Sequence, residues 1–209
     1  MTEKKNIMER FAGKGVYPHQ LAWVLLLPFR NLYLSPKKLI RRLELKDDFR
    51  VLELGPGPGY FSPRVARAIP KGKLYLADIQ AEMLEKAARR LRKRKAVNFE
   101  TVRLDGTSLP FANDFFDVIY LVTVLGEISE QETYAREMHR ILKPGGIVSI
   151  SEQAGDPDSL PLEGVQKLLE PAGFALDKVF GKGRTYTANF RKAEVDGDER
   201  LSDTGLYLK

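Results

Sequence analysis

A glycine-rich turn directly after a short apolar run is the feature that most restricts how this chain can fold. The run 50–54 contains Glu53 and leads into the turn Gly55-Pro56-Gly57-Pro58-Gly59. Glycine at alternate positions lets the backbone turn sharply and lets a ligand approach the main chain, because no Cβ is in the way. Ser62-Pro63 then predicts the cap and first turn of a helix whose N-terminus faces the turn.

Strand-like and helix-like segments alternate through the rest of the chain. Strands are predicted at 50–54, 73–77, 97–104, 116–122 and 147–151, and helices at 62–69, 81–94, 129–142 and 162–170. The run 129–132 matches a capping box for the helix 129–142, and the run 143–146 is expected to end that helix. Such alternation predicts a mostly parallel sheet with helices on both faces. Two last strands, 175–180 and 184–191, are joined by a short turn, which predicts an antiparallel strand at the end of the sheet. We therefore expect an α/β fold of the Rossmann-like, doubly wound kind.

The two ends of the chain differ from this alternating middle. Residues 1–45 are predicted to form an N-terminal helical cap, with one helix over 17–34 and a second that is capped by Ser35 and ends near residue 45. Residues 46–193 are predicted to form the main ligand-binding domain, and residues 194–209 a flexible polar tail. The most apolar stretch, 21–29, is too short for the about 20 residues that span a bilayer. It predicts a helix that packs on the sheet edge, or one that makes peripheral membrane contact.

Composition excludes several kinds of chemistry. The 209 residues include no cysteine and two histidines, so thiolate sites are excluded and no metal site is expected. The first ten residues are polar and show no signal peptide, and we expect a cytoplasmic protein. The net charge of +6 owes much to the basic run 89–95. We expect this run to be a solvated helix end rather than a nucleic-acid site, because it lacks aromatic side chains that stack on bases.

Details of the glycine turn narrow the class of ligand. The dinucleotide fingerprint Gly-x-Gly-x-x-Gly needs glycine at position 60, where this chain has Tyr60. Pro56 and Pro58 remove two backbone N–H donors that a pyrophosphate would use. Because the carboxylate of Glu53 precedes the turn, the expected ligand is not a polyphosphate and carries positive charge.

Acidic side chains also follow the next two predicted strands. Asp78 stands where a carboxylate can accept hydrogen bonds from both hydroxyls of a ribose. Asp105 stands where it could accept one from an adenine amino group, or could simply stabilise a turn. The carboxyl ends of parallel strands share one edge of a sheet, and ligands of open α/β sheets bind at that edge.

Five segments in this order resemble the class I S-adenosylmethionine-dependent methyltransferases, especially their ubiquinone/menaquinone-biosynthesis-like, type 11 branch. The segments are 51–59, 76–79, 105–111, 116–120 and 141–146. The resemblance implies S-adenosylmethionine as cofactor, and its ammonium and sulfonium groups carry the positive charge inferred above. It also implies a seven-stranded sheet whose last strand is antiparallel.

The resemblance assigns roles in cofactor binding to eleven residues. They are Glu53, Gly55, Gly57, Gly59, Asp78, Ile79, Met83, Asp105, Gly106, Leu121 and Val122. The glycine turn and Glu53 are expected to flank the methionine moiety, with a backbone carbonyl of 121–122 near its ammonium group. Asp78 is expected to bind the ribose, Ile79 and Met83 to contact the adenine faces, and Asp105 to contact the adenine amine.

The sequence says less about the methyl acceptor than about the cofactor. In-line methyl transfer mainly needs alignment and exclusion of water, and it needs a base only when the nucleophile carries a proton. Candidate catalytic residues are Tyr17, His19 and Glu127. His19 could act as a base near neutral pH or could pack the start of a helix. Glu127 and Glu152 follow two strands and could face the acceptor or be exposed structural carboxylates.

Absent motifs narrow the choice of acceptor. The segment after 116–122 lacks the Asn/Asp-Pro-Pro-Tyr signature of enzymes that methylate base amines, and the absence of cysteine argues against arsenite as acceptor. We expect methyl transfer to a small, hydrophobic molecule. The alternatives are an RNA or protein substrate, or a non-enzymatic sensor that binds S-adenosylmethionine or S-adenosylhomocysteine.

Overall fold

The computed structural model of this protein describes residues 34–193. Its strands are β1 (Arg50–Leu54), β2 (Lys73–Asp78), β3 (Phe99–Arg103), β4 (Phe116–Val122), β5 (Leu142–Glu152), β6 (Phe174–Lys182) and β7 (Thr185–Lys192). Its helices are α3 (Pro36–Arg42), α4 (Ser62–Ala68), α5 (Ala81–Lys93), α6 (Gln131–Ile141) and α7 (Leu162–Leu169), with 3-10 turns η3 (Leu125–Glu127) and η4 (Glu170–Ala172). The expected helix at 17–34 and the tail at 194–209 lie outside the described residues, apart from Leu34.

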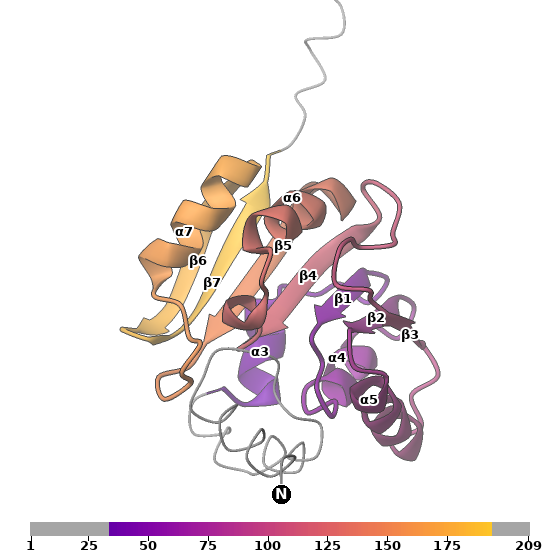
Figure 1. Cartoon of the computed structure of the whole chain (residues 1–209). Helices are drawn as coiled ribbons and strands as arrows, with labels where there is room; N and C mark the ends of the chain where they lie inside the picture. Colours follow the sequence, from indigo (N-terminus) through magenta and orange to yellow (C-terminus); the bar gives the residue numbers. More distant parts are fainter. Residues whose placement is uncertain (1–33, 194–209) are drawn as a thin grey trace, which may run out of the picture.

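All seven strands form one sheet, in the order β3-β2-β1-β4-β5-β7-β6 (Figure 1). The strands β1 to β5 pair in parallel, and β7 runs antiparallel to both of its neighbours, β5 and β6. This topology confirms the expected sheet. The strand order reverses between β1 and β4, and such a switch point is where open α/β sheets bind their ligands.

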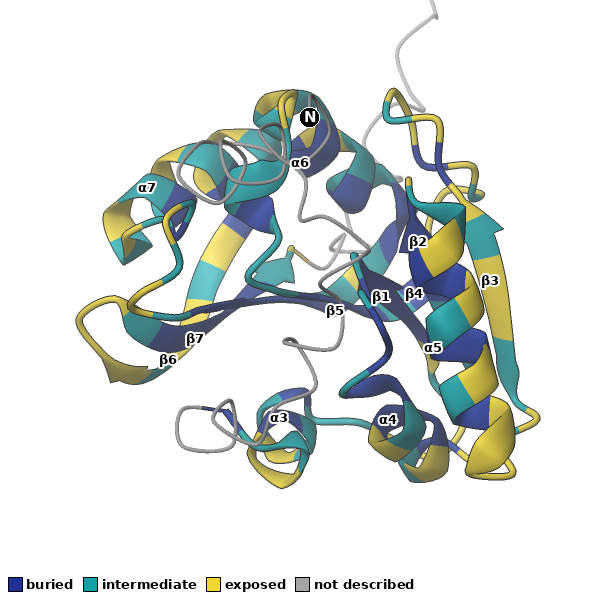
Figure 2. Cartoon of the chain, turned by 60° about the horizontal axis from the view of Figure 1, so that its bottom comes forward, coloured by how far each residue is buried: buried dark blue, intermediate teal, exposed yellow. Residues whose placement is uncertain are grey.

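Helices cover both faces of the sheet, with α3, α4 and α5 on one face and α6 and α7 on the other (Figure 2). Alternate residues of each buried strand point to opposite faces. In β1, for example, Val51 packs with the α3–α5 side and Leu52 with the α6–α7 side. The continuous apolar runs of β1 and β4 therefore follow from burial on both faces.

One of three predicted helix caps is confirmed. The Ser35 side chain caps α3 by accepting a hydrogen bond from the N–H of Lys38 at 3.3 Å. The expected capping box at 129–132 is wrong, because α6 has Glu130 as its N-cap, and this residue makes no capping hydrogen bond through its side chain. Ser62 is not an N-cap either, because α4 begins after Phe61 and the Ser62 hydroxyl bonds a buried carboxylate instead.

Strand boundaries differ from expectation at two places. The run Lys143-Pro144-Gly145-Gly146, expected to end a helix before a strand, already belongs to β5, whose register with β4 is irregular between Phe116 and Val118. Gly145 has a φ of +73°, which lets the extended chain kink without leaving the sheet. The strand β3 begins at Phe99, and Val97 before it is 91% exposed.

Within residues 34–193, no helix has the length and apolar character needed to cross a membrane.

Candidate functional site

The glycine turn after β1 needs glycine for steric reasons. Gly55, Gly57 and Gly59 all have positive φ angles, of 68°, 52° and 76°. A Cβ on Gly55 would come within 2.6 Å of the Val124 side chain, and one on Gly59 within 2.9 Å of the Ala87 Cα. The turn is therefore held between the segment that follows β4 and the helix α5.

The backbone donors of this turn are already used within the protein. The N–H of Gly55 donates to the Ala77 carbonyl at 2.8 Å, and that of Gly59 donates to the Pro56 carbonyl at 3.0 Å. The N–H of Gly57 hydrogen-bonds the carboxylate of Asp78. Since the two prolines have no N–H, the turn offers none of its glycine donors to a phosphate. This geometry supports the argument against a dinucleotide.

Glu53 is a buried carboxylate at the base of the turn. Its side chain is 3% exposed, and its Oε2 atom accepts a hydrogen bond from the Ser62 hydroxyl at 2.5 Å. The buried hydroxyl of Tyr120 lies beside this carboxylate, close enough to stabilise its charge but without full hydrogen-bond geometry. Burial raises the pKa of Glu53 to about 7, so a cationic ligand would favour the ionised form.

Asp78 connects the end of β2 to the glycine turn. Its Oδ1 atom accepts a hydrogen bond from the N–H of Gln80 at 2.9 Å, and the N–H groups of Gly57 and Ile79 also bond the carboxylate. Burial raises the pKa of Asp78 to about 6 in spite of these bonds. One carboxylate thus both shapes the turn and stands at the predicted ribose position.

The two residues expected at the adenine faces differ in exposure. Ile79 is 39% exposed at the carboxyl edge of the sheet, where an apolar side chain could cover a ring. Met83 is 2% exposed and lies on the buried side of α5. The structure therefore leaves Ile79 accessible to a ligand and places Met83 in the interior.

Asp105 lies in an exposed turn just beyond β3. Its Oδ1 atom accepts hydrogen bonds from the N–H and the hydroxyl of Thr107, both at 2.8 Å. These bonds lower the pKa of Asp105. The structure thus shows the turn-stabilising role that was the alternative for this residue, and Gly106 beside it has a φ of +88°.

The segment after β4 closes over the glycine turn. Leu121 is buried and Val122 is half-buried at the end of the strand. Thr123 then adopts a φ of +54° while its N–H donates to the Ser151 carbonyl at 2.8 Å. This bend directs the chain into η3, where Glu127 is half-buried. Tyr17 and His19, the other two catalytic candidates, lie outside the described residues.

Glu152 is the clearest residue of this edge that the sequence did not explain. The sequence is compatible with a side chain that faces the acceptor or with an exposed structural carboxylate, and the structure shows Glu152 only 3% exposed at the end of β5. The sequence contained a signal for this burial, because Glu152 directly follows the apolar strand predicted at 147–151.

Among residues 34–193 there is no group of three or more acidic or histidine side chains placed to hold a metal ion.

Comparisons with known proteins agree with this geometry. Residues 51–146 match the family described as a methyltransferase domain. The chain is 34% identical over 128 residues to a protein of Coxiella burnetii named ubiquinone/menaquinone biosynthesis C-methyltransferase UbiE, covering 60% of this chain and 51% of that protein. The match to a UbiE protein of Pectobacterium carotovorum is 35% identical over 105 residues, covering 49% of this chain and 42% of that protein. Residues 51–146 therefore form a methyltransferase domain, which is similar to those of the class I S-adenosylmethionine-dependent enzymes.

Solved structures show how widely this methyltransferase fold is shared. A methyltransferase from Aquifex aeolicus superposes with a TM-score of 0.76 at 24% identity, covering 84% of this chain and 98% of that one. The [4+2]-cyclase SpnF superposes with a TM-score of 0.61 at 26% identity, covering 69% of this chain and 57% of that one. The chain also spans only about half the length of the UbiE relatives. Fold alone therefore does not decide the reaction.

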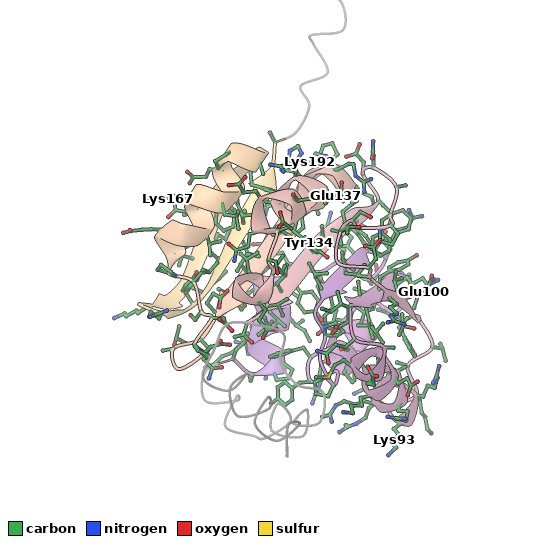
Figure 3. The ribbon with its side chains drawn as sticks, viewed as in Figure 1. Lys93, Glu100, Tyr134, Glu137, Lys167 and Lys192 are labelled. Atoms are coloured by element: carbon green, nitrogen blue, oxygen red, sulfur yellow. The ribbon has the colours of Figure 1, made fainter. Side chains whose placement is uncertain are left out.

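The basic run 89–95 lies away from the carboxyl edge of the sheet, where the cofactor-binding residues are predicted. The helix α5 starts just after Asp78 at the carboxyl edge of the sheet. Asn98, which follows the run, hydrogen-bonds Leu74 near the start of β2, at the opposite edge. Lys93 and Glu100 lie along the side formed by α5 and β3, far from Lys167 on α7 (Figure 3). The basic residues therefore do not line the turn that follows β1.

Proposed function

We propose that this protein transfers the methyl group of S-adenosylmethionine to a small, hydrophobic, quinone-related molecule. The observation that supports it most is the buried Glu53 under a turn whose glycine donors are all used, because that arrangement favours a cation over a polyphosphate. The names of the UbiE relatives supply the quinone class of acceptor and a carbon atom as the methylated position. We also propose that it acts in the cytoplasm.

The chain's own residues would then bind and align the two reactants. Glu53 would stabilise the positive charge of the methionine end, and Asp78 would accept hydrogen bonds from the ribose hydroxyls. Ile79 would cover one face of the adenine, and a backbone carbonyl of Leu121 or Val122 would accept from the ammonium group. S-adenosylmethionine supplies a methyl group activated by its sulfonium, so the protein mainly has to align the nucleophile and exclude water.

The other residues assigned to the cofactor or the acceptor have fewer structural observations behind them. Met83 would need to be uncovered to touch the adenine, and Asp105 would need to use the oxygen that Thr107 does not bond. Glu127 is proposed on the acceptor side because it lies in η3, next to the end of β4. Tyr17 and His19 remain predictions from the sequence. Contact with a membrane surface through 21–29 remains a prediction as well.

Calorimetric titration tests the cofactor directly. Full-length protein should bind S-adenosylmethionine and S-adenosylhomocysteine, and should not bind NADH. Absence of binding for both adenosyl ligands would overturn the proposal. The second stage follows methyl-labelled cofactor into quinol, lipid, RNA and protein pools. Transfer into RNA or protein would replace the proposed acceptor, and binding with no transfer into any pool would favour a sensor.

A further inference from the structure

The carboxyl end of β5 carries a buried carboxyl group that the cofactor site does not use. Ser151 pairs with Val122 at the end of β4, so Glu152 lies at the same carboxyl edge of the sheet as the proposed cofactor site. Its strand, β5, is one strand further from β1 than β4 is. We propose that Glu152, together with Ser159, hydrogen-bonds a ring oxygen of the methyl acceptor and so orients its ring. This inference rests on the proposed function and names the group that recognises the acceptor.

Two buried polar groups in the corner formed by Glu152, Ser159 and Leu160 lack hydrogen-bond partners among the described residues. Neither Oε1 of Glu152 nor Oγ of Ser159 has one in the described part of the chain, and the two side chains are 3% and 4% exposed. The N–H of Leu160, the residue after Ser159, donates a hydrogen bond to the Glu152 carboxyl group, so the two unpaired groups lie close together. Leaving such a group unpaired costs about 1–3 kcal/mol. Native proteins retain these groups where a ligand or water uses them.

Close packing holds the corner in place. A Cβ on Gly126 would come within 1.8 Å of the Asp158 carbonyl oxygen, so η3 and the segment after β5 touch through their backbones. The Tyr186 hydroxyl donates to the Leu160 carbonyl at 2.9 Å. The Arg184 guanidinium donates to the Ser159 carbonyl at 2.6 Å. Groups held in this way lose little freedom when they bind a ligand.

The charges around Glu152 favour its protonated form. Asp156 in the following segment and Glu127 in η3 both oppose its ionisation, while Arg184 before β7 favours it. Tyr186 on β7 is neutral, because burial and the nearby Glu152 raise the pKa of its hydroxyl more than Arg184 lowers it. Burial and the two acids outweigh Arg184 and the Leu160 N–H, and the pKa of Glu152 rises to about 8. A protonated carboxyl group and a serine hydroxyl are both donors, and they suit an oxygen acceptor.

The test compares Glu152→Gln, Glu152→Ala and Ser159→Ala with the wild type. Glu163→Gln, on the exposed first turn of α7, is the matched control. The acceptor is a naphthoquinol that carries a short prenyl chain and lacks the ring methyl group. KM for the quinol is measured from pH 6 to 9.5, and affinity for S-adenosylmethionine is measured by calorimetry. Thermal unfolding identifies any variant that does not fold.

Glutamine keeps the donor of a protonated carboxyl group but cannot ionise. Glu152→Gln should therefore keep KM near the wild-type value at pH 7 and remove the rise of KM that the wild type shows above about pH 8. Glu152→Ala and Ser159→Ala should raise KM about tenfold, the scale of one lost hydrogen bond, while cofactor affinity stays unchanged.

Three outcomes would overturn the inference. Equal KM values and pH profiles in all variants would mean that the corner does not contact the acceptor. A loss in Glu152→Gln as large as in Glu152→Ala would mean that an ionised carboxylate is needed, as for an amine. If the wild type binds the cofactor but does not methylate the quinol, the quinone proposal fails, and this inference fails with it. If Glu152→Ala does not fold, Glu152→Gln and Ser159→Ala decide the question.

Discussion

Single side chains at the carboxyl edge of the sheet stabilise the fold and also occupy the positions proposed for ligand binding. Asp78 is the clearest example, because its carboxylate accepts a hydrogen bond from the Gly57 N–H and also stands at the proposed ribose position. We expect Asp78→Ala to weaken S-adenosylmethionine binding by about 1–3 kcal/mol, the scale of hydrogen bonds to a charged group. Calorimetry measures the change, and unchanged affinity would remove Asp78 from the binding site. The exposed Glu82→Ala on α5 is a suitable control.

The protonation of Glu53 makes a second prediction at the same scale. Burial raises the pKa of Glu53 to about 7, and a cationic ligand prefers the ionised carboxylate. Affinity for S-adenosylmethionine should therefore fall as pH drops from 8 to 6, by up to about tenfold for each pH unit below 7. Glu53→Gln should bind weakly and with little dependence on pH in this range. A flat pH profile in the wild type would contradict the role of Glu53.

At the scale of elements, a row of polar residues crosses the sheet on the side of α3. Tyr120 in β4, Ser149 in β5 and Asn189 in β7 are cross-strand neighbours at one register. Each has a buried side-chain atom without a hydrogen-bond partner in residues 34–193. Glu53 continues the row into β1, because it pairs with Tyr120. The layer under α3 is thus polar where a sheet face is usually apolar.

Two serines of β5 on this face allow a comparison between a hydroxyl that has a hydrogen-bond partner and one that has none. The Ser151 hydroxyl lies 2.7 Å from the Thr187 hydroxyl, whereas the Ser149 hydroxyl has no hydrogen-bond partner among residues 34–193. Ser151→Ala should lower the free energy of unfolding by about 1 kcal/mol, and Ser149→Ala should leave it unchanged or raise it. Urea denaturation measures both. If Ser149→Ala is the more destabilising variant, an ordered water must bind its hydroxyl.

At the scale of the whole molecule, three buried carboxyl groups determine how stability depends on pH. Burial raises the pKa of Glu53 to about 7, of Asp78 to about 6 and of Glu152 to about 8. Because these values exceed those of the unfolded chain, about 4, the folded state binds more protons between pH 4 and 8. The stability that comes from this difference is fully present near pH 4 and is lost as pH rises toward 8.

The free energy of unfolding in the absence of ligand should therefore decrease from pH 5 to pH 8. Glu44 and Glu137, whose pKa values are lowered by ion pairs, give the opposite trend only below their usual range. His139, whose pKa is lowered by burial, opposes the three carboxyl groups near its usual range but is a single group. Urea denaturation across this range measures the slope, and the double variant Glu53→Gln, Glu152→Gln should flatten it. A maximum of stability at pH 8 would show that these groups are ionised in the folded protein.

Local patterns of residues were enough to predict most of the architecture. The alternation of strands and helices, the hairpin at the end and the glycine turn were all correctly placed, because apolar periodicity and turn residues act over short distances along the chain. The same locality explains the errors. Ser62 and the 129–132 run have the composition of helix caps, but a cap depends on which partner the side chain meets in space.

The sequence by itself determined the order of the elements and the class of ligand at the turn after β1. Only the tertiary structure decided the environment of each acid at the carboxyl edge. Glu53 bonds Ser62, Asp105 bonds Thr107, and Glu152 is buried near η3 and β7 with one oxygen that has no partner in the described part of the chain. Burial and partners arise from strands that are distant in the sequence, and these through-space contacts set both the pKa values and the available hydrogen bonds.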